Sequence, residues 1–108
     1  MQSEAPHKRV LVVDDDEIVA FIASHTLGRY NFAVQTATSA AALRGGCDGY
    51  DAVVVSSEIA REVTASLDGA RTVILGDGVP GLTAFARLRK PVELDQLVTA
   101  VTACANRR

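Results

Sequence analysis

Residues 51–59 read DAVVVSSEI, a run of three valines that ends in two serines. Valine is branched at Cβ and favours extended backbone, and a short apolar run between polar residues is typical of a strand buried on both faces. RVLVV at residues 9–13 has the same character, and so has RTVIL at residues 71–75. Strands of this kind occur in parallel sheets that helices cover on both sides.

Strand-like and helix-like segments alternate along the rest of the chain. Two more strands are predicted at FAVQTA (residues 32–37) and FARLR (residues 85–89). Helices are predicted at residues 17–30, at the Ala-rich stretch after Ser39, at a short segment carrying Ile59, Val63 and Leu67, and after Pro91. Five strands alternating with helices predict right-handed crossovers and a doubly wound α/β fold with a five-stranded parallel sheet.

Length and composition indicate one compact domain. The chain has 108 residues, 48% of them hydrophobic, with a net charge of −2; we assign residues 9–106 to the domain and residues 1–8 to a leader or linker. The charge gives no support for nucleic-acid binding, and no apolar run approaches the roughly 18 residues of a membrane helix. Cys47 and Cys104 lack metal or disulfide spacing, so we expect free thiols in a reducing cytoplasm.

Ligands of such folds bind at the carboxyl ends of the strands. The residues expected there are Asp14, Asp15 and Asp16 after the first strand, Ser56 and Ser57 after the third, Gly76 and Asp77 after the fourth, and Lys90 after the fifth. We therefore expect any functional pocket to be built from this set.

VLVVDDDE at residues 10–17 and RKP at residues 89–91 lie in register with the five-strand alternation. On these motifs the chain resembles the receiver domain of two-component response regulators over residues 8–106. YDAVVVSSEIA at residues 50–60 is similar to the family's stretch around the phosphoacceptor aspartate. The resemblance implies a flavodoxin-like fold with strand order 2-1-3-4-5. It also implies that Asp14 and Asp15 would hold Mg²⁺ and that Lys90 would pair with the phosphoryl group.

Three positions depart from the family's pattern. Ser56 stands where the acceptor aspartate belongs, Gly76 where a Thr or Ser hydroxyl bonds the phosphoryl group, and Arg87 where an aromatic residue switches position. A serine hydroxyl is neutral near pH 7 and needs an adjacent base, and we expect no histidine at a strand end. We therefore expect a vestigial pocket of Ser56, Gly76 and Lys90, without catalysis.

Several smaller roles follow from the same positions. Asp14 and Asp15 could still bind Mg²⁺ weakly, Lys90 could neutralise the acidic pair directly, and Asp77 is either a substitute acid or a turn residue. We expect Asp16 to cap the first helix and Ser57 to cap the third. His25, one helix turn past Phe21 and Ile22, is predicted to be a partly buried structural histidine.

Only GDGVPGLTA, residues 76–84, joins the fourth and fifth strands. A parallel crossover normally takes a dozen or more residues, so we predict that the fourth helix is lost or reduced to a turn. Alternation places Phe85, Arg87 and Arg89 on one side of the fifth strand, and buried unpaired arginines would cost several kcal/mol each. We therefore predict an open face that shows these three residues beside apolar side chains of the fourth strand.

Two functions, neither enzymatic, remain open. The first is a phosphorylation-incompetent pseudo-receiver, part of a hybrid histidine kinase or multidomain regulator, that docks a histidine kinase, receiver or output domain and contacts neither DNA nor membrane. The second is a sensor whose Phe85, Arg87 and Arg89 bind a nucleotide second messenger such as cyclic di-GMP; the resemblance alone supplies this ligand class. Alternatively, Arg87 and Arg89 are solvated charges on an edge strand.

Overall fold

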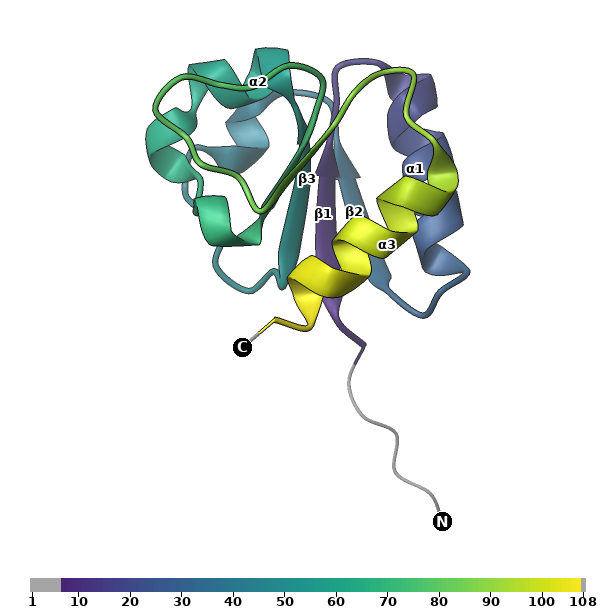
Figure 1. Cartoon of the computed structure of the whole chain (residues 1–108). Coiled ribbons are helices and arrows are strands. Elements are labelled where there is room, and N and C mark those ends of the chain that lie inside the picture. Colours follow the sequence, from purple (N-terminus) through teal and green to yellow (C-terminus); the bar gives the residue numbers. More distant parts are fainter. Residues whose placement is uncertain (1–6, 108) are drawn as a thin grey trace.

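The chain folds into a five-stranded parallel sheet with helices on both faces (Figure 1). This computed structural model describes residues 7–107, so most of the expected leader lies outside the described residues. The strands are β1 (Arg9–Val13), β2 (Ala33–Ala37), β3 (Ala52–Ser56), β4 (Thr72–Leu75) and β5 (Ala86–Leu88). Their order is β2-β1-β3-β4-β5, which confirms the predicted fold class and strand order.

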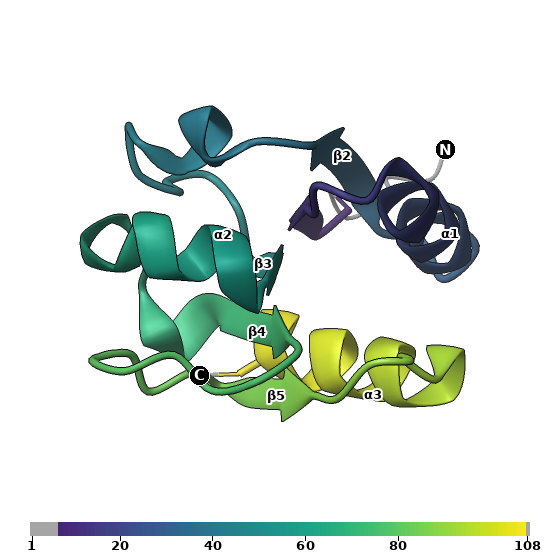
Figure 2. The same cartoon turned by 90° about the horizontal axis from the view of Figure 1, so that it is seen from above.

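Within residues 7–107 the α-helices are α1 (Glu17–Gly28), α2 (Ser57–Glu62) and α3 (Leu94–Ala105). Three 3₁₀ helices join them, η1 (Ala40–Leu43), η2 (Thr64–Ser66) and η3 (Gly69–Arg71). The helix predicted after Ser39 is thus only a 3₁₀ turn. In the view from above, α1 and α3 cover one face of the sheet while α2 and the η1 segment lie over the other (Figure 2). No helix in the described part of the chain is long and apolar enough to cross a membrane.

The core consists of two layers, one on each face of the sheet. Alternate strand residues such as Val12 and Val54 pack with α1 and α3, whereas Val13 and Val55 pack with η1 and α2. Each fully buried aliphatic side chain of this kind contributes about 1.5–3 kcal/mol relative to an exposed one. The central strands are buried on both faces, as their unbroken valine runs predict.

α1 presents two apolar faces, and the sheet takes the smaller one. Ala20, Ala23 and Leu27 are buried against the strands. Ile18, Phe21 and Ile22 remain 69%, 67% and 43% exposed. The alanines let the helix backbone approach the sheet closely, so the larger side chains point outward.

His25 belongs to this outer face. It is exposed and its ring stacks on Phe21, with ring centroids 6.0 Å apart and planes inclined by 15°. The prediction of a partly buried structural histidine is therefore wrong, because the stripe that carries His25 faces away from the core.

The segment between β4 and β5 contains no helix within the described residues 76–85, as predicted. It instead lies back on the sheet, where Val79 is buried and Leu82 and Ala84 are half-buried in the layer that contains Ile74. Every residue of β4 is buried. The predicted open face beside apolar β4 side chains is therefore wrong, since the loop itself supplies the cover.

The alternation predicted for β5 is confirmed. Arg87 and Arg89 are exposed and Phe85 is 39% exposed. Ala86 and Leu88 pack against the layer under α3. The guanidinium groups thus stay in solvent, where their charge carries no desolvation cost.

Candidate functional site

The strand ends gather the predicted polar residues at one edge of the sheet. Val13 pairs with Val55 and Ser56 with Leu75, so Asp14, Ser56 and Gly76 follow one another across three neighbouring strand ends. Lys90 reaches the same edge from the segment after β5 and bonds Asp14. The structure therefore brings Asp14, Ser56, Gly76 and Lys90 to the same edge of the sheet, as the strand alternation predicts.

Asp14 is fully buried, and both of its carboxylate oxygens have partners. Oδ1 accepts a hydrogen bond from the Asp16 backbone amide at 2.9 Å, and Oδ2 accepts one from Lys90 Nζ at 3.2 Å. Lys90 follows β5 and precedes Pro91 through a cis peptide bond. The lysine thus neutralises the buried acid directly, one of the two roles considered for it.

The residues at this edge do not fit a magnesium site. Asp15 and Asp77 are exposed, and no group of three His, Cys, Asp or Glu side chains suited to a metal occurs within residues 7–107. Mg²⁺ takes oxygen ligands in near-octahedral geometry, whereas Asp14 has no exposed surface and is paired with Lys90, which leaves Asp15 as the accessible carboxylate of the pair. Asp77 does not join the acidic pair as a substitute ligand.

The Ser56 hydroxyl serves the helix that follows it. Ser56 is fully buried and is the N-cap of α2, its Oγ accepting a hydrogen bond from the Ile59 backbone amide at 3.4 Å. The prediction that Ser57 is the cap is wrong, because α2 begins at Ser57 itself. At the other end of the pocket Asp16 caps α1 as predicted, through bonds from the Ile18 and Val19 amides.

Gly76 holds a backbone conformation that excludes the hydroxyl residue of the family's pattern. Its φ is +121°, and a Cβ there would lie 2.6 Å from Ser57 Oγ. Its amide donates to the Leu88 carbonyl at 2.8 Å, which fixes the turn that leaves β4. A threonine or serine at this position would be strained at this φ, and the Ser57 hydroxyl would have to rotate away from the new Cβ.

A cavity of about 430 Å³ lies over this edge and has mixed charge. Arg89 and Lys90 line it together with Glu58 and Asp77, so it offers no excess positive charge to an anion. A Cβ on Gly78 would lie 3.3 Å from an Arg87 terminal nitrogen, which places Arg87 along the loop. Arg89 thus lines the cavity, whereas Arg87 lies beside the β4–β5 segment.

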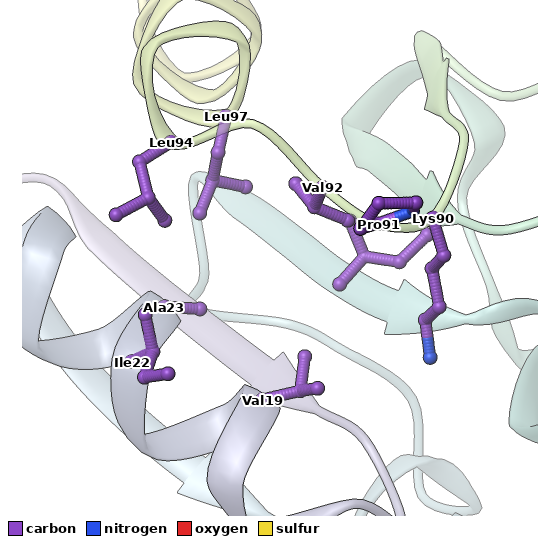
Figure 3. A pocket seen from close by; sticks show the side chains of 9 residues that line it. Val19, Ile22, Ala23, Lys90, Pro91, Val92, Leu94 and Leu97 are labelled. Carbon is purple, nitrogen blue, oxygen red and sulfur yellow. The ribbon is translucent and has the colours of Figure 1, made fainter.

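A second cavity, of about 230 Å³, lies between α1 and the start of α3 (Figure 3). Val19 and Ala23 of α1 lie on one side of it and Leu94 and Leu97 of α3 on the other, with the cavity almost wholly apolar. Sequence reasoning missed this feature. The signal was present in the second stripe of α1, since a helix that is apolar on two faces has one face more than the sheet can cover.

Cys104 and Tyr50 both take part in the packing of the domain. Cys104 is fully buried and Tyr50 packs on the layer under η1 and α2. The Arg9 guanidinium lies 4.6 Å from the centre of the Tyr50 ring. Both residues stabilise the end of the sheet opposite the pocket.

Neither a family model nor a curated protein matches the sequence. Solved structures do match. A receiver domain protein from Clostridium thermocellum is 24% identical with a TM-score of 0.71, covering 92% of this chain and 94% of its own. The non-phosphorylated HemR receiver domain from Leptospira biflexa is 17% identical with a TM-score of 0.74, covering 94% and 96%.

A response regulator receiver protein from Sinorhizobium medicae WSM419 is 25% identical with a TM-score of 0.64, covering 93% of this chain and 95% of its own. The fold is therefore that of response regulator receiver domains.

Proposed function

We propose that this domain is a phosphorylation-incompetent pseudo-receiver that acts as a regulatory protein-interaction module in two-component signalling. One observation carries the proposal. β3 ends in Ser56, a buried neutral hydroxyl that caps α2, where the receiver pattern has its acceptor carboxylate.

Phosphoryl transfer from a phosphohistidine needs an acceptor that is already anionic. A serine hydroxyl becomes nucleophilic only beside a general base. Asp14, the acid at the neighbouring strand end, is paired with Lys90 and buried. A phosphoserine is moreover a stable ester, so a modified Ser56 would not turn over as an acyl phosphate does.

The same contacts stabilise the pocket without phosphate or metal. Lys90 and Asp14 form an internal ion pair that joins the end of β1 to the segment after β5. This pair stands where a receiver would have a site that phosphorylation switches. A domain of this kind regulates by binding, and its partners are a histidine kinase, another receiver or an output domain of the same system. The surface that supports this is α1, where three large apolar side chains are exposed together.

The nucleotide-sensor alternative has less support. Its premise was an open β4/β5 face, and β4 is covered by the loop that carries Val79. Phe85, Arg87 and Arg89 keep exposed surface, but apolar β4 side chains do not accompany them.

The test is incubation of the protein with acetyl phosphate and Mg²⁺, followed by intact-mass measurement. We expect the mass to stay unchanged, while an active receiver domain treated in parallel gains one phosphate. An adduct that appears in the wild type and disappears in Ser56→Ala would overturn the proposal, because the hydroxyl would then be a working acceptor.

A further inference from the structure

The two edges of the sheet differ in how they are protected. β5 is only three residues long, and it carries the exposed Arg87, with Arg89 just beyond its end. β2 is five residues long and reads AVQTA, without a charge, a proline or a glycine, and its register with β1 is regular. Natural edge strands are usually short, charged or interrupted, because an open row of backbone groups pairs with other chains. β2 has none of these protective features.

The outward backbone groups of β2 belong to Val34 and Thr36. The Ala33 amide and the Ala37 carbonyl bond the segment that contains β1. Because the backbone groups of successive residues point to opposite sides of a strand, the N–H and C=O groups of Val34 and Thr36 point away from the sheet. β2 ends the row of strands in Figure 2, and within residues 7–107 no strand pairs with its outer side.

One face of β2 also lacks a full covering helix. Ala33 and Gln35 are exposed on the face where η1 is only a 3₁₀ turn. A cavity of about 210 Å³ opens there, lined in part by Arg9, Gln35 and Tyr50. On the opposite face Val34 packs in the layer under α1. The Gln35 side chain is therefore free to meet another chain at the edge of the sheet.

Charge is distributed unequally along this edge. At the amino end of β2 lie Lys8, whose carbonyl bonds the first residue of the strand, and Arg29, which follows α1. At the carboxyl end lie Asp15 and Glu17, in the segment that leads from β1 into α1. All four side chains belong to exposed residues. A strand running antiparallel to β2 would meet complementary charge if it came from a second copy, whereas a parallel copy would bring like charges together.

The sequence of β2 is nearly symmetric about Gln35. Antiparallel pairing about this residue sets Val34 of one copy opposite Thr36 of the other, and these two residues exchange both backbone bonds. Gln35 then faces Gln35 of the second copy at about 4.5 Å between Cα atoms, the distance of a pair without backbone bonds. The two side-chain amides can each donate and accept, and β-branched residues opposite each other stabilise a sheet. A two-fold axis at Gln35 relates the copies and closes the assembly.

We propose that β2 is a homodimer interface, in which two copies of the chain pair antiparallel about Gln35 and join their sheets into one. A second copy is the occupant because it supplies both the matching strand and the complementary charges at its two ends. The proposal is independent of the state of Ser56, so it stands or falls separately from the pseudo-receiver function.

Sedimentation equilibrium tests the association itself. An interface built on one strand is small, so we expect a weak monomer–dimer equilibrium over protein concentrations of roughly 10 μM to 1 mM. Added salt should shift this equilibrium toward the monomer, because the charges at the two ends of the strand are exposed.

A charge swap at Gln35 tests the axis. Gln35→Lys and Gln35→Glu should each weaken the dimer about five- to tenfold, because two like charges then meet across the axis. An equal mixture of the two variants should restore association, since lysine of one copy then faces glutamate of the other. Gln96→Lys adds the same charge at an exposed glutamine of α3 and should leave the dimer unchanged. Circular dichroism checks that each variant is folded.

Amide hydrogen exchange gives a second readout, followed by NMR as the protein concentration rises. Protection of the Val34 and Thr36 amides should increase with concentration in the wild type and stay low in Gln35→Lys. The Ala33 amide bonds the Lys8 carbonyl within one copy and is the internal reference, so its protection should not depend on concentration.

Several outcomes overturn the proposal. They are a monomer up to about 1 mM, a dimer that Gln35→Lys leaves intact, and a mixture of the two charge variants that stays monomeric. Association that Phe21→Glu abolishes and Gln35→Lys spares would place the contact on α1 instead. A monomer with protected Val34 and Thr36 amides would assign the edge to another segment of the same chain. A phosphoryl adduct on Ser56 with the dimer intact contradicts only the pseudo-receiver function.

Discussion

Lys90 Nζ lies 3.2 Å from Oδ2 of Asp14, a carboxylate with no exposed surface, and the pair joins positions 76 residues apart in the chain. The two partners differ in environment, since the lysine side chain is 38% exposed. Water therefore screens the ammonium in part. The buried carboxylate has no such screening, so it depends more on the contact than the lysine does.

Loss of the ammonium should destabilise the fold. We expect Lys90→Met to lower the free energy of unfolding by about 1–2 kcal/mol, below the roughly 3–5 kcal/mol of a fully buried pair because Lys90 is partly solvated. Urea denaturation measures the change. In an Asp14→Asn background the same substitution should cost much less, and an equal cost in both backgrounds would show that the ion pair contributes nothing.

Gly76 should resist the residue types that the receiver pattern prefers. Gly76→Ser forces a left-handed backbone on an L residue and brings Cβ to 2.6 Å from Ser57 Oγ, so we expect a loss of about 2–4 kcal/mol. Gly45→Ala is the control, because it has ordinary φ and open space around its Cβ, and it should change stability by less than about 1 kcal/mol. A Gly76→Ser protein as stable as the wild type would mean that the turn can reopen for a phosphoryl-binding hydroxyl.

Ser56 should matter to α2 and Ser57 should not. Removing an N-cap hydroxyl typically costs about 0.5–2 kcal/mol, and the 3.4 Å bond to the Ile59 amide places Ser56→Ala toward the lower end of that range. Ser57→Ala removes no capping bond and is the matched control. Chemical denaturation compares the two variants, and a larger loss in Ser57→Ala would return the cap to the position that the sequence suggested.

The fold could be predicted from the sequence because its strongest signals are local. Three consecutive valines before Ser56 predict a strand buried on both faces. The alternation of strands with helices predicts a parallel sheet. The strand-end residues follow from topology, since parallel strands end at one edge. Asp14, Ser56 and Lys90 therefore meet where the sequence places them.

Two features could not be predicted because they depend on competition between elements. α1 offers the sheet either Ala20, Ala23 and Leu27 or a stripe of larger side chains, and only close packing in three dimensions selects the alanines. The β4–β5 segment looked too short and too rich in glycine to cover anything. Val79 nevertheless packs in the layer that contains Ile74, with Leu82 and Ala84 half-buried beside it, so the segment covers β4 without a helix.

Stability should fall at alkaline pH through the thiols. Burial raises the pKa of the Cys104 thiol above its ordinary value of 9.0, with Arg107 opposing the shift in part. Because the folded state holds this proton more tightly than the unfolded state, stability is intact well below pH 9.0 and declines as the pH rises through and past that value.

Cys104→Ala should therefore flatten the alkaline decline of the unfolding free energy, measured by denaturation across the pH range. Burial also raises the pKa of Cys47, with Asp48 and Asp68 adding to the shift. Cys47 is only half-buried, so Cys47→Ala should flatten the decline less. A slope unchanged in both variants would show that other groups cause the alkaline loss.

Val79 should be the residue that closes the β4/β5 face. Val79→Asp places an unpaired carboxylate beside buried Ile74, and we expect a loss of at least about 2 kcal/mol with faster amide exchange in β4 than in β1. Thr83→Asp, an exposed change in the same loop, should have little effect. If the two variants are equally stable, the loop does not cover the sheet. The face beside Arg87 would then be open, and the nucleotide-sensor alternative would be supported again.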